Sequence, residues 1–256
     1  MATPDFGKTA VDYATHRAGF PPRLFDRLQA FAIGQPGQRA LDLGTGTGTV
    51  ARSLALRGCT VTGLDPSPEL VTQARALDAA AGVRVTYVMG RAEATGLPSA
   101  SFEVVTAGQC WHWFDGLAAA NECLRLLVPG GTLVICHFDW LPLPGNVVEA
   151  SERLIERHNP AWKFGGGLGI HPRHTVPVTV AGFGEIETFS FDLDVPYTHE
   201  AWRGRIRASA GVAATLASEA VAAFDAEHAA MLRERFPADP LAVPHRVWAL
   251  VARKPG

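Results

Sequence analysis

The sequence predicts an α/β fold with a doubly wound, mostly parallel sheet. From about residue 20 to 138, short β-rich runs alternate with longer helical patterns, and this alternation is typical of parallel strands joined by crossover helices. A glycine-rich turn follows the first β-rich run, at the place where open α/β sheets bind ligands. The chain of 256 residues is long enough to bury a substantial core.

The elements of this alternating region can be placed in order along the chain. Apolar and β-branched runs predict the strands, and helical spacing of apolar residues predicts the stretches between them. We expect strands at 39–43, 59–65, 83–89, 101–108 and 132–138, and helices at 49–56, 68–80 and 117–127. Because ligands bind outside the carboxyl ends of such strands, the residues that follow each strand are the first candidates for a site.

The alternation stops at residue 139. Clustered Pro and Gly in WLPLPGN and FGGGLGIHP surround one helical segment at 147–158, a composition too irregular for another crossover unit. We expect a lid or substrate cap there. The remaining sequence predicts a strand at 183–193, helices at 198–208 and 217–236, and a last strand at 245–254.

These elements predict one domain over residues 1–256. We expect its core to comprise 20–138, 183–195 and 243–254. The cap is then formed by 139–182 and 197–236.

Composition limits the classes of molecule that the protein is expected to bind. Lys plus Arg number 23 and Asp plus Glu number 25, for a net charge of −2, so no strongly basic balance favours nucleic acid or an anionic membrane. There is no run of about 18 apolar residues and no secretory leader pattern. The four cysteines form no CxxC pair, so we expect reduced, mostly buried thiols. These features predict a soluble cytoplasmic protein without nucleic-acid or membrane partners. We expect a monomer or homodimer that acts on a small molecule.

The glycine-rich turn LDLGTGTGTV permits two interpretations. As G-x-G-x-x-A, the residues Gly46, Gly48 and Ala51, with Asp65 further along, match a dinucleotide fingerprint. As D-x-G-x-G-x-G, the turn places the Asp42 carboxylate at the end of the first strand. An anion there would repel a pyrophosphate but attract an ammonium group.

S-adenosylmethionine carries such an ammonium group on its methionine arm, which Asp42 could attract directly or through water. Asp65 ends the second strand in LDPS, where a carboxylate can accept two hydrogen bonds from ribose hydroxyls. The alternative for Asp65 is a cap of the following helix, for which Ser67 is a competing candidate.

Five motifs resemble those of class I S-adenosylmethionine-dependent methyltransferases: LDLGTGTG, GLDPS, GRAEATGLP, FEVVTAGQCWHWFD and LRLLVPGGTLVI, in this order and spacing. The resemblance covers about residues 8 to 138. It implies a Rossmann-like sheet of seven strands, the last one antiparallel. Within the class, the motifs resemble those of the methyltransferase type 11 group. GQCWHWFD and YATHRAGFP look like the small-molecule methyltransferases that act on trans-aconitate or thiols, although Ala18 and Phe20 depart from the usual proline and tyrosine.

The resemblance also implies cofactor contacts. Gly44, Thr45 and Gly46 would form the floor under the methionine arm, and Asp65 would bind the ribose with Pro66 and Ser67 beside it. Ala92 and Glu93 would contact adenine, while Arg91 stands where many relatives have an acidic residue, so it either stacks on the ring or is a solvated arginine. Gln109 and Cys110 would meet the methionine arm through backbone atoms. Tyr13 and Arg17 would close over its carboxylate, unless this N-terminal segment is frayed.

The loop QCWHWFD, residues 109 to 115, places aromatic side chains at the end of the fourth strand of this region. His112 is the candidate catalytic residue, as a general base with a pKa near working pH. The alternative is a packed imidazole that braces or positions the loop, which suits acceptors that need little base. Trp111 and Trp113 are candidate acceptor contacts, or else core residues.

The cap supplies aromatic and imidazole side chains that could enclose an acceptor, although each alone is more often structural. They are Trp140, His158, Trp162, Phe164, His171 and His174. Arg203 and Arg207 could receive an acidic acceptor, but ion pairing is the favoured account. His137 and Asp139 are too few ligands to predict a metal, and nothing near Cys110 predicts a reactive thiol.

The sequence thus predicts a methyltransferase that moves a methyl group from S-adenosylmethionine to an oxygen, sulfur or nitrogen atom of a small molecule by in-line displacement. S-adenosylhomocysteine is the expected product. The alternatives are a noncatalytic sensor of the cofactor and an NAD(P)-dependent oxidoreductase.

Overall fold

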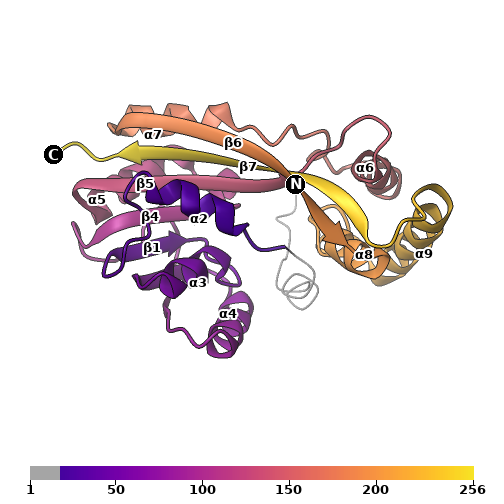
Figure 1. Cartoon of the computed structure of the whole chain (residues 1–256), viewed down its shortest axis with the longest axis horizontal. Coiled ribbons are helices and arrows are strands. Elements are labelled where there is room, and N and C mark those ends of the chain that lie inside the picture. The colour runs from indigo at the N-terminus through magenta and orange to yellow at the C-terminus, as the bar shows by residue number, and fades with distance from the viewer. Residues whose placement is uncertain (1–17) are drawn as a thin grey trace. The chain divides into compact units, whose positions relative to one another are not determined.

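The computed structural model describes residues 18–256, and Figure 1 shows its elements along the chain. The strands are β1 (Arg39–Leu43), β2 (Thr60–Asp65), β3 (Thr86–Met89), β4 (Phe102–Gly108), β5 (Leu127–Trp140), β6 (Gly184–Tyr197) and β7 (Leu241–Arg253). The helices are α2 (Pro22–Gln29), α3 (Thr49–Leu56), α4 (Pro68–Ala80), α5 (Gly116–Leu126), α6 (Val147–His158), α7 (Thr175–Ala181), α8 (His199–Arg207) and α9 (Ser218–Arg235). Two 3₁₀ turns, η2 (Trp111–Trp113) and η3 (Pro172–His174), complete the list.

The sheet has seven strands in the order β3-β2-β1-β4-β5-β7-β6. β1 lies parallel to both β2 and β4, β2 is parallel to β3, and β4 is parallel to β5, whereas β7 is antiparallel. The predicted doubly wound sheet with an antiparallel last strand is therefore confirmed. The strand order reverses between β1 and β4, and open α/β sheets bind ligands at such a switch point.

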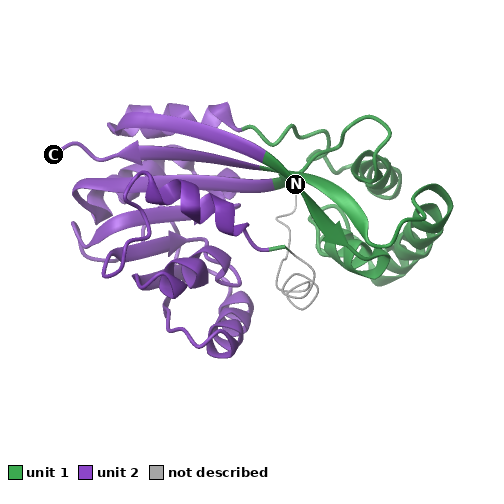
Figure 2. Ribbon diagram, in the orientation of Figure 1, with its two compact units in different colours: residues 1–18, 139–170, 192–246 green, residues 19–138, 171–191, 247–256 purple. Residues whose placement is uncertain are grey.

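The described chain divides into two compact units (Figure 2). Unit 2 consists of residues 19–138, 171–191 and 247–256, and unit 1 consists of Ala18 together with residues 139–170 and 192–246. These borders differ from those of the expected core and cap, because residues 171–182 belong to unit 2. The physical reason is that α7 packs on α5 and buries Val178 in the core of unit 2.

The core of unit 2 follows from the alternation of side chains along its strands. Leu41 and Leu43 of β1 share one buried cluster with Cys123 of α5, Val178 of α7 and Trp248 of β7. The residue between them, Asp42, therefore points to the opposite face of the sheet. That face is covered at this position by the start of α3, whose Ala51 N–H donates to the Asp42 carboxylate.

Unit 1 has its own buried core, built from α6, α8, α9 and the strand ends that it contains. Trp202 of α8 is fully buried, and its indole N–H donates to the Ser151 hydroxyl of α6 at 3.0 Å. Phe224 and Leu232 of α9 are also fully buried in this cluster. The three helices are thus fixed by one apolar core with a satisfied polar group inside it.

Two helices were not predicted from the sequence. α2 begins at Pro22, directly after its N-cap Pro21, and has only eight residues, and α7 reads TVPVTVA, which is rich in β-branched residues that favour strands. Burial of Leu24, Phe25 and Leu28 in α2 and of Val178 in α7 stabilises both helices despite the weak local signal. None of the helices in residues 18–256 is long and apolar enough to cross a membrane.

Candidate functional site

Asp42 lies one residue before the end of β1 and is almost wholly buried, with 1 % of its surface exposed. Its Oδ1 accepts the Thr106 hydroxyl at 2.7 Å, and its Oδ2 accepts the Thr45 hydroxyl at 2.7 Å and the Ala51 N–H at 3.3 Å. Burial raises the pKa of Asp42 to about 6, against the lowering effect of these hydrogen bonds. The carboxylate thus ties β1, β4 and α3 together, and its attraction for an ammonium group is a prediction.

The glycine loop, residues 44–48, follows β1 with its three glycines at positive φ. A Cβ at Gly44 would lie 2.9 Å from the Cβ and Sγ atoms of Cys110, and one at Gly48 would lie 2.6 Å from the Tyr87 hydroxyl. Gly46 differs, because a Cβ there would meet no atom of residues 18–256 within 4 Å. Two glycines are therefore required by packing within the protein, while Gly46 presents bare backbone to open space.

Asp65 fastens the glycine loop from the end of β2. Its Oδ2 accepts the Gly46 N–H at 2.8 Å, and its Oδ1 accepts the Ser67 N–H at 2.9 Å. Burial raises its pKa. Ser67, not Asp65, is the N-cap of α4, because its hydroxyl accepts the Leu70 N–H, and Pro66 lies between the two. A carboxylate has about four acceptor sites, so Asp65 retains capacity for ligand hydroxyls.

The predicted adenine segment forms a tight loop in which Arg91 bridges to Ala94. Ala92 is buried, and Glu93 accepts the Asp115 N–H at 3.1 Å, next to the start of α5. The Arg91 side chain is largely exposed and lies 3.7 Å from the Glu93 carboxylate. The loop is therefore held by its backbone and Glu93, and the Arg91 side chain is accessible to a ligand.

Gln109 and Cys110 follow β4 directly. Gln109 has a φ of 60°, a left-handed conformation that is uncommon for a residue with a side chain. Its Oε1 accepts the Phe138 N–H at 2.6 Å, and its own N–H donates to the Cys136 carbonyl at 2.8 Å. The Cys110 thiol donates to the Leu43 carbonyl at 3.1 Å. The loop after β4 is thus pinned to both β5 and β1.

The aromatics of η2 separate into buried and exposed residues. Trp111 is buried in the core of unit 2 and meets Phe114 edge to face. Trp113 is 40 % exposed, and its ring lies 4.7 Å from the exposed His112 ring, measured between centroids. Trp111 therefore packs as a core residue, while His112 and Trp113 are accessible to a ligand.

In unit 1, three of the four predicted acceptor residues contribute to packing or ion pairs. Trp140 donates to the Glu152 carboxylate at 2.7 Å and stacks under the Arg205 guanidinium. His158 bonds to Glu227 at 2.8 Å. Trp162 is buried in the unit 1 core. Phe164 is 54 % exposed.

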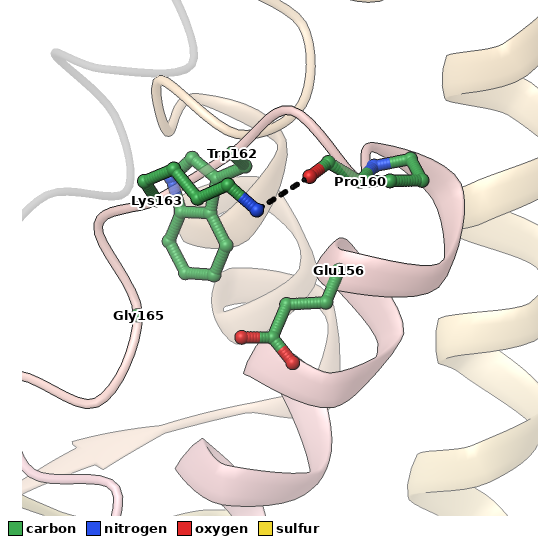
Figure 3. Close-up of a pocket in the computed structure, with 5 residues that line it drawn as sticks. All are labelled: Glu156, Pro160, Trp162, Lys163 and Gly165. Atoms are coloured by element: carbon green, nitrogen blue, oxygen red, sulfur yellow. Dashed lines mark hydrogen bonds between the residues drawn. The ribbon is translucent and has the colours of Figure 1, made fainter.

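A surface pocket of about 450 Å³ lies within unit 1 (Figure 3). It is lined by Glu156, Pro160, Trp162, Lys163 and Gly165. The Lys163 ammonium donates to the Pro160 carbonyl at 3.0 Å, and the Glu156 side chain extends from α6 below it. One predicted acceptor residue, Trp162, therefore also borders a hollow of small-molecule size.

The remaining candidates have clear placements. Arg203 and Arg207 both pair with Asp225, so the expected ion pairing is confirmed. All four cysteines are buried thiols, as expected. Tyr13 and Arg17 lie outside the described residues.

The structure brings together a cluster that the sequence analysis missed. His137, near the end of the unit 2 part of β5, meets His171 and His174 of the η3 turn, and their ligand nitrogens lie within 4.8 Å of one another. In the sequence, His137 stands close to Asp139, and these two make too small a ligand set for a metal. The i, i+3 spacing of HPRH was the signal that could have drawn attention to His171 and His174 as a pair.

Comparison with known proteins agrees with this geometry. Residues 41–135 match the family of methyltransferase domains. The chain is 31 % identical over 184 residues to a ubiquinone biosynthesis O-methyltransferase of Xanthomonas campestris pv. campestris (strain 8004), covering 70 % of this chain and 74 % of that protein. It is 37 % identical over 128 residues to an uncharacterized methyltransferase of Mycobacterium tuberculosis (strain ATCC 25618 / H37Rv), covering 50 % of this chain and 49 % of that protein.

Among solved structures, the YcgJ protein of Bacillus subtilis has the same fold, with a TM-score of 0.60 at 17 % identity, covering 92 % of this chain and all of that one. The match to the mycobacterial relative spans about half of that protein's length. The match to the Xanthomonas relative, by contrast, spans nearly three quarters of it. Together with the switch-point glycine loop, these matches show that the chain belongs to the class I S-adenosylmethionine-dependent methyltransferases.

Proposed function

We propose that the protein transfers a methyl group from S-adenosylmethionine to a small-molecule acceptor, with S-adenosylhomocysteine as the product. The observation that carries this proposal is the pairing of Gly46 and Asp65: open backbone at the first position, held by a carboxylate at the second. Close backbone approach suits the cofactor's methionine arm, and the remaining acceptor sites of Asp65 suit ribose hydroxyls.

Methyl transfer from a sulfonium is an in-line displacement. The acceptor's lone pair forms a bond to the methyl carbon while the carbon–sulfur bond breaks, and its electrons stay on sulfur. The protein's task is to align the two reactants and exclude water, so no covalent nucleophile is needed. The rigid loop after β4, pinned by Gln109 and Cys110, supports such alignment.

His112 and Trp113 are the proposed acceptor contacts in unit 2, because both are exposed beside that loop. For a protonated acceptor, His112 is the proposed general base. Oxygen is the first acceptor atom to test, since the Xanthomonas relative is an O-methyltransferase. The net charge of −2 favours a small molecule over nucleic acid.

The direct test mixes methyl-labelled S-adenosylmethionine with the protein and a fractionated cell extract. We expect label in the small-molecule fraction, from which the product can be identified by mass. Label confined to protein or RNA would contradict the small-molecule acceptor, and cofactor binding without any transfer would favour a sensor. Thermal shifts with NADH and with S-adenosylmethionine separate the oxidoreductase alternative, because only a true ligand stabilises the fold.

The cofactor site is tested by Asp65→Ala, for which we expect a loss of about 1.5–3 kcal/mol in binding free energy, the scale of hydrogen bonds to a charged group. Asp26→Ala is the matched control, because Asp26 is an exposed carboxylate paired only loosely with Arg57 at 3.5 Å. Calorimetric titration measures both. Equal affinity in the two variants would remove Asp65 from the site.

A further inference from the structure

We propose that His137, His171 and His174 form a binding site for a divalent transition-metal ion, with Zn²⁺ the best match. All three residues belong to unit 2. Each offers one imidazole nitrogen, and these nitrogens lie within 4.8 Å of one another. The site adds a metal to a protein whose proposed reaction does not itself require one.

The local fold explains why the three rings meet. His171 precedes η3 and His174 ends it, and the His174 N–H donates to the His171 carbonyl at 3.1 Å. Residues i and i+3 of a 3₁₀ turn lie on the same side, which brings the two rings together. The rings are parallel within 1° and their centroids are 5.3 Å apart. His137 lies against this pair, with its ring centroid 3.8 Å from that of His171.

The burial of the cluster is graded. His137 is 1 % exposed, whereas His171 and His174 are half-buried. The Trp248 ring lies 5.5 Å from His171 and 6.0 Å from His174, between centroids, and gives the cluster an apolar wall. A metal here would have one deeply placed ligand and two near the surface, so it can be reached from solvent.

The donor set selects the metal. Imidazole nitrogens suit zinc, copper, iron and nickel, whereas magnesium and calcium prefer oxygen ligands. With Zn–N bonds of about 2.0 Å, the nitrogens of a tetrahedral site are about 3.3 Å apart. The three nitrogens lie within 4.8 Å of one another, so His171 and His174, which are both half-buried, would need only side-chain adjustments to reach that spacing.

Three protein ligands leave a fourth position open, as in catalytic zinc sites. The His112 ring lies 5.6 Å from the His137 ring, between centroids, so the cluster adjoins the proposed acceptor contacts of unit 2. At the open position, a metal would lower the pKa of an acceptor hydroxyl or thiol by binding its oxygen or sulfur. This use of the open position rests on the proposed function, whereas the metal site does not.

Cobalt titration tests the site without reference to activity. The full chain is treated with a chelator, dialysed and titrated with Co²⁺, whose visible absorption reports tetrahedral nitrogen ligands. We expect one equivalent of Co²⁺ to bind and one equivalent of Zn²⁺ to displace it. His171→Gln and His174→Gln should each weaken binding by more than about 100-fold, because loss of a direct ligand exceeds the 10–100-fold effect of losing an outer-shell partner.

His158→Gln is the control variant, because His158 is a partly exposed histidine of unit 1 that pairs with Glu227. We expect its affinity for Co²⁺ to lie within about twofold of that of wild type. The losses in His171→Gln and His174→Gln would then be specific to the proposed site. Circular dichroism checks that each variant folds. Absence of a stoichiometric Co²⁺ complex, or equal affinity of all three variants, would overturn the proposal and leave the cluster as stacked packing.

A second measurement separates this proposal from the proposed function. Binding of S-adenosylmethionine to chelator-treated protein should match that of untreated protein within about threefold, because the glycine loop shares no side chain with the cluster. Cobalt binding without cofactor binding would support the metal site and contradict the methyltransferase function. The reverse result would do the opposite.

Discussion

The glycine loop of unit 2 and the segment 139–170 of unit 1 use their characteristic residues in different ways. In the loop, two buried carboxylates hold backbone and hydroxyl groups while Gly46 is left open. In the segment, the rings of Trp140 and Trp162 pack in or against the unit 1 core, and Phe164 is exposed. The spacing of the glycines therefore predicts where backbone is open to a ligand. The aromatic residues of the segment, by contrast, mostly form part of a core. Four predictions test this contrast.

The largest expected effect is that of Trp162→Ala. Trp162 is buried among apolar residues of unit 1, and truncation of a buried aromatic costs about 3–5 kcal/mol of unfolding free energy. Phe164→Ala is the control and should change stability by less than about 0.5 kcal/mol, because Phe164 is exposed. Urea unfolding measures both. Unchanged stability of Trp162→Ala, with a raised KM for the acceptor, would assign Trp162 to the acceptor site instead.

The next comparison is within the glycine loop. Gly44→Ala should lower the unfolding free energy by about 2–4 kcal/mol, because it adds a clash with Cys110 to the cost of a positive φ. Gly46→Ala should cost only about 1–2 kcal/mol, since its Cβ meets no atom in the described part of the chain. Its effect should fall on cofactor affinity, with a loss of at least about tenfold, or about 1.4 kcal/mol. Equal effects of both substitutions on stability and affinity would contradict the division between them.

Asp42 provides a pH test. Burial raises its pKa from 3.8 to about 6, so the folded protein holds this proton more tightly than the unfolded chain does. The resulting stability is present at low pH and is lost as the pH rises through about 6. From about pH 4 to 7, the unfolding free energy of wild type should fall relative to that of Asp42→Asn by about 2–3 kcal/mol. A difference that is constant over this range would contradict the raised pKa.

The smallest expected effect is that of Arg91→Ala. The Arg91 side chain is largely exposed, so we expect a change in unfolding free energy below about 0.5 kcal/mol. Stacking of an exposed guanidinium on adenine is worth about 0.5–1 kcal/mol, so cofactor affinity should fall by less than about fivefold. Unchanged affinity would identify Arg91 as a solvated arginine without a ligand.

Most of the sheet could be predicted from the sequence, and particular residues show why. The expected helix at 68–80 agrees with α4 because Ser67 and Pro68 mark its start and its apolar spacing is clear. α7 could not be predicted, because TVPVTVA becomes helical only through burial of Val178 against α5. β5 begins earlier than expected, since VPGG suggests a turn yet lies within the strand.

The candidate site could also be predicted only in part, because some of its residues meet through tertiary packing that leaves no local signal. Asp65 ends β2 and Gly46 follows β1, and parallel strands end at the same edge of the sheet, so their meeting could be inferred from chain order alone. His137 and His171 are far apart in the sequence and meet only through tertiary packing. Composition could name the aromatics of the segment 139–170 but could not tell which rings face the core.

The division into two units has a consequence for attempts to exchange specificity between relatives. The chain passes from one unit to the other between residues 18 and 19, 138 and 139, 170 and 171, 191 and 192, and 246 and 247. Strands β5, β6 and β7 each contain one of these junctions, as Figure 2 shows. Unit 1 is therefore not a cassette with two ends. A graft that keeps it whole must replace several separate stretches at once and splice them inside three hydrogen-bonded strands.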